Sequence, residues 1–202
     1  MCLMMSKFYR FAKIVVGAIY RIMFRFRVTG AENIPAEGGT IVCANHTSLQ
    51  DTVVLGVACR RQLHFLAKHE LWQIKYLSWL FDGLGAVPVN RENPSMDSFK
   101  RTLQLLKEGR AIAIFMQGGR RQDIDQSDAK AGVALFAVKG RVPVVPVNIS
   151  SKFKIFSKVH INIGKPISFE DYWDKKVRTD QLNEIAGKVM DAIAGLGNTA
   201  VV

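Results

Sequence analysis

The sequence contains few cysteines, and their spacing excludes the frameworks that cysteine-rich chains use. Cys2, Cys43 and Cys59 make an odd number and form no C-x-x-C pair. Neither a disulfide framework nor a cysteine zinc site is therefore expected. Cys43 and Cys59 lie in apolar runs and are predicted to be small core residues. A reducing cytosolic setting fits this pattern best.

The N-terminal region lacks an apolar run of membrane-spanning length. The longest uncharged stretch in residues 1–30 is IVVGAIY, at residues 14–20. A spanning helix needs about 20 mostly apolar residues, so no ordinary transmembrane segment is predicted here. A cleaved signal peptide is also not expected, because basic residues continue beyond the apolar stretch and no A-x-A site follows.

Acidic residues are absent from residues 1–30, whereas Lys and Arg occur there six times. On a helical wheel at about 100° per residue, residues 7–26 separate into two arcs. The basic arc holds Lys7, Arg10, Lys13, Arg21 and Arg25, and the apolar arc holds Phe8, Val15, Ile19, Ile22, Met23 and Phe26. This pattern predicts that residues 1–27 form an amphipathic membrane-binding helix, with arginines near lipid phosphates. The alternative is a helix packed on its own domain.

The whole chain has 202 residues and a formal net charge of +11. That length allows one domain with a substantial core. An anionic partner is expected: a membrane surface, a phosphorylated substrate or a nucleic acid. No helix-turn-helix, zinc-finger or RNP1-like pattern is present, so no nucleic-acid partner is predicted.

Beyond a turn-rich connector at residues 28–39, short apolar runs alternate with amphipathic segments. Strands are predicted at residues 40–44, 63–67, 85–89, 111–115, 142–149 and 159–164. Helices are predicted at residues 49–61, 69–81, 94–109, 128–140 and 179–197. This alternation predicts a single α/β domain, residues 28–202, with a mostly buried mixed sheet flanked by helices.

Polar groups that could carry chemistry follow several of these strands. The first strand is followed by His46 and Asp51, and the later ones by Lys68, Arg91, Gly118, Arg120 and Arg121. Strand ends of α/β sheets commonly form sites. A histidine held by a carboxylate can act as a base, and glycines beside arginine allow backbone amides to approach an anion. Alternatively, Asp51 only favours the first turn of a helix capped by Ser48, and His46 is a hydrogen-bonded turn residue.

Two other kinds of site find no support in the sequence. A metal site built from His46, His64, His69 and Asp51 is not predicted, because no H-E-x-x-H spacing exists. A serine-hydrolase elbow is absent as well, since no G-x-S-x-G pattern occurs. We therefore expect neither a metal nor another cofactor.

Five blocks resemble those of the glycerolipid acyltransferase family, most closely the bacterial lysophosphatidate acyltransferases, in the family's order. NHTSLQD fits the family's NHxSxxD block, which carries the His-x4-Asp motif. LAKHELW is similar to its lysine–glutamate–leucine block, and LGAVPVNRE to its GxIPVxR block. FMQGGRR and VPVVPVNI occupy the places of FPEGTRS and VPIVPVAI.

The resemblance implies acyl transfer from an acyl thioester to the 2-hydroxyl of lysophosphatidate, giving phosphatidate in phospholipid biosynthesis. His46 would deprotonate the hydroxyl and Asp51 would orient His46. Arg91 and Arg120, with Gly118 and Lys68, would bind the phosphate. Val145 and Pro146 would line the acyl site, and the hydroxyl would attack the thioester without a covalent acyl-enzyme.

The expected partners are lysophosphatidate, an acyl carrier protein or coenzyme A thioester, and an anionic membrane surface. The expected location is the cytoplasmic face of the cell membrane, as a peripheral or monotopic protein. The FMQGGRR block departs from the family, since Gln117 and Gly119 replace Glu and Thr. This departure leaves glycerol-3-phosphate or another lyso-lipid open as acceptor. A non-catalytic lipid-binding relative is the more distant alternative.

Overall fold

A computed structural model describes residues 5–90, 96–116, 126–173 and 175–198. Its centre is a seven-stranded sheet in the order β1-β7-β6-β2-β5-β3-β4. The strands are β1 (Arg25–Thr29), β2 (Thr40–Ala44), β3 (Leu63–Lys68), β4 (Val87–Val89), β5 (Ala111–Phe115), β6 (Val144–Ser151) and β7 (Lys158–Ile163). Neighbouring strands are parallel except for β6 and β7, which are antiparallel. The predicted α/β domain with a mixed sheet is confirmed.

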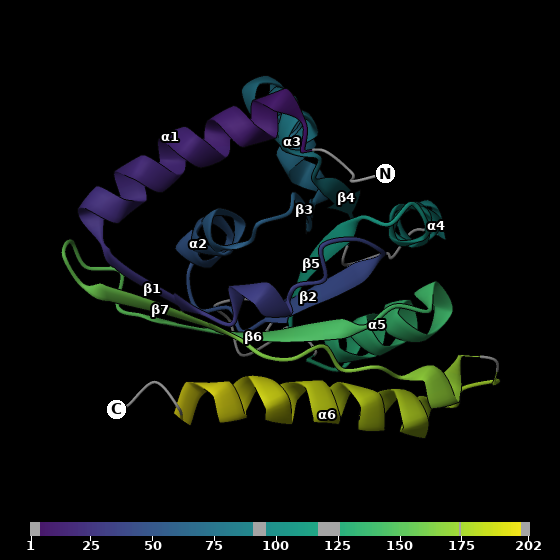
Figure 1. The fold of residues 1–202 in the computed structure, drawn as a ribbon. Coiled ribbons are helices and arrows are strands. Elements are labelled where there is room, and N and C mark those ends of the chain that lie inside the picture. Colours follow the sequence, from purple (N-terminus) through teal and green to yellow (C-terminus); the bar gives the residue numbers. More distant parts are fainter. Residues whose placement is uncertain (1–4, 91–95, 117–125, 174, 199–202) are drawn as a thin grey trace.

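Helices cover both faces of the sheet (Figure 1). They are α1 (Lys7–Met23), α2 (Gln50–Ala58), α3 (Lys75–Leu84), α4 (Met96–Lys107), α5 (Gln126–Gly140) and α6 (Thr179–Asn198). Short 3-10 helices span Ala31–Asn33, His69–Gln73 and Glu170–Tyr172. In Figure 1, α1 and α2 lie on one side of the sheet, and α5 and α6 lie on the other.

The core has two halves because the side chains of β2 alternate between the two faces. All five residues of β2 are buried. Ile41 and Cys43 pack with apolar residues of α4, α5 and α6. Val42 and Ala44 pack with apolar residues of α2 and with Phe24. Burial raises the pKa of the Cys59 thiol, which lies in this second half, to about 12, as expected for a core cysteine.

Two parts of the chain differ most from the predicted elements. The first helix ends at Met23, and Arg25–Thr29 form β1 at the edge of the sheet. Residues 25–27, assigned above to the membrane helix, therefore belong to the sheet. The strand β1 was not predicted because its sequence is rich in basic residues. It forms by pairing with the distant strand β7, where Arg25 lies opposite Lys158. Residues 69–81, expected as one helix, divide at Ile74 into a 3-10 segment and α3.

The helix α1 is docked against the domain by a narrow stripe. Tyr9 and Gly17 are buried, and the Tyr9 hydroxyl accepts a hydrogen bond from the Leu63 amide at 3.3 Å. Burial raises the pKa of Tyr9 to about 12, so its hydroxyl stays neutral at ordinary pH. Lys13 donates to the Cys59 carbonyl oxygen, and burial lowers its pKa. Lys13 therefore faces the domain, which corrects its place on the predicted lipid-facing arc.

The opposite side of α1 exposes large apolar residues. These are Phe11, Ile14, Val15, Ile19 and Ile22. Phe8, by contrast, packs edge-on against Trp79 of α3, with ring centroids 5.1 Å apart. The alternative of a helix packed on its own domain is therefore correct for one face of α1, and membrane binding by the exposed face stays a prediction. No helix in the described part of the chain is long and apolar enough to cross a bilayer.

Candidate active site

The turn after β2 is held in place by an asparagine. The Asn45 amide nitrogen donates to the Ile149 carbonyl at 2.9 Å, and its oxygen accepts from the Ile149 amide at 2.7 Å. The last backbone pair between β2 and β6 is Ala44 with Val147. The Asn45 side chain extends this pairing by one residue. Asn45 thereby fixes the point at which the chain leaves the sheet. Sequence reasoning assigned it no role, although it opens the NHxSxxD block.

Asp51 lies in the first turn of α2 and is fully buried. Its Oδ2 atom accepts hydrogen bonds from the backbone amides of Thr47 at 2.6 Å and Ser48 at 2.7 Å. A carboxylate that accepts amide protons at a helix N-terminus is stabilised by those charge-assisted bonds and by the helix dipole. The interpretation of Asp51 as a first-turn acid is thus correct, but the capping position of α2 is Leu49 rather than the predicted Ser48 and makes no side-chain capping bond.

The same oxygen also meets the histidine. His46 Nδ1 lies 3.2 Å from Asp51 Oδ2, and the His46 side chain is 22% exposed. The alignment falls short of a full hydrogen bond, and Asp51 Oδ1 has no hydrogen-bond partner among the described residues. Catalytic contacts are often loose before substrate binds. A carboxylate only accepts, so the proton belongs on Nδ1 and Nε2 is left with a free lone pair.

An aromatic residue supports the imidazole from one side. The ring of Phe115, the last residue of β5, stacks on His46 with centroids 4.3 Å apart and planes 29° apart. Phe65 of β3 stacks behind Phe115 at 6.3 Å. The contact restricts rotation of the imidazole and leaves its edge available. Sequence reasoning missed Phe115, because only the pairing of β2 with β5 brings the two rings together.

Of the predicted phosphate-binding residues, the structure describes Lys68 alone. Lys68 ends β3, is exposed, and is paired with Val89 at the end of β4. Arg91 follows two residues later but lies outside the described residues, as do Gly118 and Arg120. The Met116 amide, just before the glycine-containing segment, donates to the Ala44 carbonyl at 3.0 Å. Met116 therefore lies beside the last residue of β2, two positions before His46.

The two residues predicted to line the acyl site lie in β6. Val145 and Pro146 are buried, opposite Val42 and Cys43 of β2. The Pro146 carbonyl accepts from the Gly164 amide at 2.8 Å. Val145 belongs to the half of the core that also contacts Phe115, which supports the His46 ring. Their role in holding an acyl chain stays a prediction.

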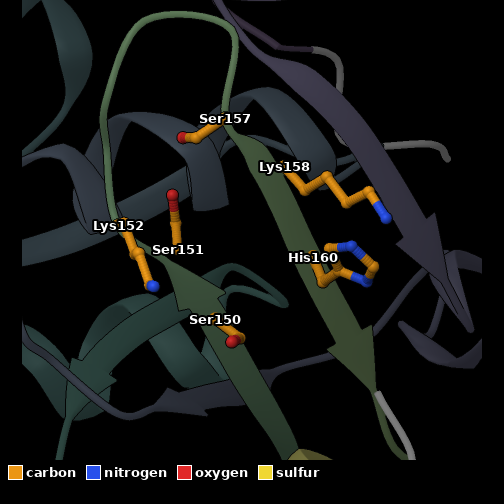
Figure 2. A pocket seen from close by; sticks show the side chains of 6 residues that line it. All are labelled: Ser150, Ser151, Lys152, Ser157, Lys158 and His160. Atoms are coloured by element: carbon orange, nitrogen blue, oxygen red, sulfur yellow. The ribbon is translucent and has the colours of Figure 1, made fainter. Parts of the chain in front are cut away.

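A separate hollow of about 400 Å³ lies where β6 turns into β7. Figure 2 shows its lining, which consists of Ser150, Ser151, Lys152, Ser157, Lys158 and His160. None of these is a predicted site residue. The hollow carries two lysines and no acid, so it is a positively charged feature distinct from the His46–Asp51 pair.

These observations define an α/β protein with a histidine beside a buried carboxylate, just past the carboxyl end of its central strand. The sequence model of the family described as Acyltransferase matches residues 25–150. That span contains β1 to β5, most of β6 and the whole His46 turn. The chain belongs to the acyltransferase family.

Individual relatives agree with this assignment. A 1-acyl-sn-glycerol-3-phosphate acyltransferase of Bacillus subtilis is 32% identical over 170 residues, covering 81% of this chain and 84% of the relative. A protein of the same name from Streptococcus pneumoniae is 28% identical over 191 residues, covering 90% and 70%. The crystal structure of the acyltransferase PlsC from Thermotoga maritima has the same fold, with a TM-score of 0.72 over 96% of this chain and 82% of that one, at 23% identity.

Proposed function

We propose that this enzyme transfers a fatty acyl group from an acyl thioester to the 2-hydroxyl of lysophosphatidate and so makes phosphatidate. The observation that carries the proposal is the His46–Asp51 contact of 3.2 Å at the end of β2. It is supported by relatives of that activity that match most of the chain. The thioester is carried by an acyl carrier protein or by coenzyme A.

The reaction needs one base and no covalent intermediate. His46 Nε2 takes the proton of the 2-hydroxyl as its oxygen attacks the thioester carbonyl. The imidazolium that forms lies beside the Asp51 carboxylate, which stabilises its positive charge. The C–S bond then breaks, and the imidazolium returns its proton to the leaving thiolate. Proton and charge are balanced, and His46 is regenerated.

Phosphate recognition is assigned to the cations that follow β3, β4 and β5. Arg91 and Arg120 bind the phosphate as planar donors, with Lys68 and the backbone at Gly118 contributing. Gln117 and Gly119 stand where the family has Glu and Thr, so this part of the site carries more positive charge than the family pattern. The extra positive charge favours binding of a phosphate group that carries two negative charges.

The enzyme works at the cytoplasmic face of the cell membrane, where its lipid substrate resides. The exposed apolar face of α1 and the flanking cations Lys7, Arg10 and Arg21 support this placement. Exposed Ile74, Tyr76 and Trp79, in and before α3, enlarge the apolar surface beside the start of α1, where Phe8 contacts Trp79. A basic and apolar helix of this kind binds anionic interfaces without crossing them.

An acyl-transfer assay over a panel of acceptors tests the proposal. Purified enzyme should acylate lysophosphatidate in preference to glycerol-3-phosphate, other lysophospholipids and neutral monoacylglycerol. Failure to acylate any acceptor, with folded protein and either thioester donor, would reject the activity.

The phosphate assignment has its own test in the same assay. Arg91→Ala and Arg120→Ala should each raise KM for lysophosphatidate far more than for monoacylglycerol, by roughly tenfold or more for a lost charge-assisted contact. Lys165→Ala is the matched control, because exposed Lys165 follows the far end of β7. An equal loss on both acceptors would contradict a phosphate-specific role.

A further inference from the structure

The connection between β6 and β7 ends in an exposed apolar tip. Ile155 is 67% exposed and Phe156 is 68% exposed, side by side in a turn of residues 152–157. Single exposed apolar residues are ordinary, but adjacent large ones at the end of a turn are a recognisable interaction feature. Apart from α1 and the region of α3, the described part of the chain has two other large apolar side chains of comparable exposure, Leu49 and Met96.

The backbone conformation of the tip does not explain its composition. The Ser157 amide donates to the Lys154 carbonyl at 2.8 Å and closes a four-residue turn. Phe156 occupies the third position of this turn with φ of 63°. Glycine or asparagine suits such a position, and a bulky residue is strained there. Neither packing within the protein nor the backbone conformation therefore favours a phenylalanine at position 156. A contact with another surface would favour it.

The turn is firmly attached to the C-terminal end of α1. The Phe156 amide donates to the Met23 carbonyl at 2.7 Å, and the Arg25 amide donates to the Ser157 carbonyl at 3.0 Å. Phe153 packs edge-on against Phe24 with centroids 6.0 Å apart. Figure 1 shows the turn beside this end of α1. Ile22, 76% exposed, lies in the same last turn of the helix.

Positive charge surrounds the tip. Lys152, Lys154 and Lys158 are exposed around it, and two of them line the hollow in Figure 2. No Asp or Glu occurs anywhere in residues 129–169. Lysines next to an apolar tip suit an anionic bilayer, because lysine stems pack on apolar groups while their ammonium groups reach the lipid phosphates.

We propose that the 152–157 turn is a second membrane-contacting element, which inserts Ile155 and Phe156 into an anionic bilayer next to α1. This inference rests on the membrane placement proposed for the enzyme. Since β6 runs parallel to β2, the turn leaves the sheet at the same edge as His46. Contact through both α1 and the turn would fix rotation about the helix axis and hold the His46 edge toward the lipid.

A double variant separates membrane contact from a structural role. Ile155→Ser with Phe156→Gly removes the apolar tip, and glycine suits the positive φ. We expect unchanged or higher thermal stability, unchanged turnover on detergent-dispersed substrate, and at least about a tenfold weaker partition into anionic vesicles. Met96→Ser is the matched control, because Met96 is 65% exposed at the start of α4. The control should partition like the wild type.

A direct measurement of depth accompanies the partition assay. Phe156→Trp adds an indole at the tip to the three native tryptophans. With vesicles containing brominated acyl chains, it should add quenchable emission beyond that of the wild type and of a Met96→Trp control. Equal quenching of all three proteins would overturn insertion of the tip.

The outcomes distinguish this inference from the proposal on which it rests. If the wild type does not bind anionic vesicles, both the membrane placement and the second element are rejected. If the wild type binds and the double variant binds equally well, the second element is rejected and α1 alone makes the contact. If the double variant unfolds at a much lower temperature, the tip is structural and the inference is wrong.

Discussion

At the scale of single residues, one carboxylate oxygen contacts both the backbone of a turn and the histidine of the candidate site. Asp51 Oδ2 accepts the amides of Thr47 and Ser48 and lies 3.2 Å from His46 Nδ1. Asp51 is therefore a helix-terminal acid and also a neighbour of His46, and its role as the partner of a base stays a prediction. The amide bonds position the carboxylate, and the carboxylate positions the imidazole.

Replacing the base should remove turnover and leave the fold intact. His46→Ala is expected to lower kcat by 10²–10⁴, about 3–5 kcal/mol of barrier, because no other group would take the hydroxyl proton. Steady-state kinetics on lysophosphatidate, with thermal unfolding alongside, measures both effects. His160→Ala, at a partly buried histidine of β7, serves as the control and should stay active. Near-normal turnover of folded His46→Ala protein would refute the assignment.

Asp51→Asn tests the two functions of the carboxylate together. The amide oxygen of Asn can still accept the Thr47 and Ser48 amides, so the free energy of unfolding should fall only by about 1 kcal/mol, the difference between charged and neutral hydrogen bonds. It cannot supply the negative charge that stabilises the imidazolium, so kcat should fall by about 10²-fold or more. Kinetics and denaturant unfolding together measure the split. A fully active but less stable variant would leave Asp51 only its capping role.

The sequence alone pointed to His46 and Asp51. It did not point to Asn45, which ties the turn to β6, or to Phe115, which supports the imidazole from β5. His46 and Asp51 are recognisable because His-x4-Asp is a pattern within one short segment. Asn45 and Phe115 act through Ile149 and His46, and those contacts exist only once β2 pairs with β5 and β6. A hydrogen bond across 104 positions in the chain has no local signature.

At the scale of elements, α1 has one face packed on the domain and one exposed apolar face, which we propose meets a membrane. Deleting residues 1–27 would remove Arg25 and Arg27 from β1 and uncover Leu63 and Cys59. Such a truncation would damage the fold as well as any membrane contact. Substitution of the outward face is therefore the cleaner experiment.

Phe11→Ser, Ile14→Ser and Ile19→Ser combined should release the protein from anionic vesicles while leaving it folded. All three side chains are between 49% and 66% exposed, so they contribute little to the core. Burial of three such residues in lipid would contribute several kcal/mol, about 1.5–3 each. Flotation of wild type and variant reports the loss, and circular dichroism reports the fold. Equal flotation would place the contact on Ile74, Tyr76 and Trp79 instead.

Elements were predicted well where a local apolar pattern specifies them. They were predicted poorly where pairing with a distant strand determines the structure. The strands β2 and β5 appear at their predicted residues because each is a continuous apolar run. β1 was missed because its alternate residues are charged and its partner is β7. Helix α1 continues to Met23 and stops there, although the sequence pattern alone extends the amphipathic wheel to Phe26.

At the scale of the whole molecule, a net charge of +11 sets how binding depends on salt. Basic residues near an anionic surface contribute about 1 kcal/mol each, and this attraction is screened within a Debye length of roughly 8–10 Å. Partition into anionic vesicles should therefore weaken steeply between low and high salt. A residual bound fraction should persist at high salt, because apolar burial is not screened.

Vesicles of zwitterionic lipid provide the control for that measurement. They should bind the protein weakly and with little dependence on salt, since only the apolar contribution remains. A salt dependence that is equally steep on both kinds of vesicle would show that the net charge does not act through anionic lipid.

The pairing of β1 with β7 has a consequence for how the chain is made. Arg25 lies opposite Lys158, so β1 has no strand partner until more than half of the chain has been synthesised. At about 5–20 residues per second, that delay is on the order of ten seconds. During this time the α1 segment has left the ribosome without β7. If α1 binds a bilayer as proposed, the nascent chain can reach the membrane before its sheet is complete.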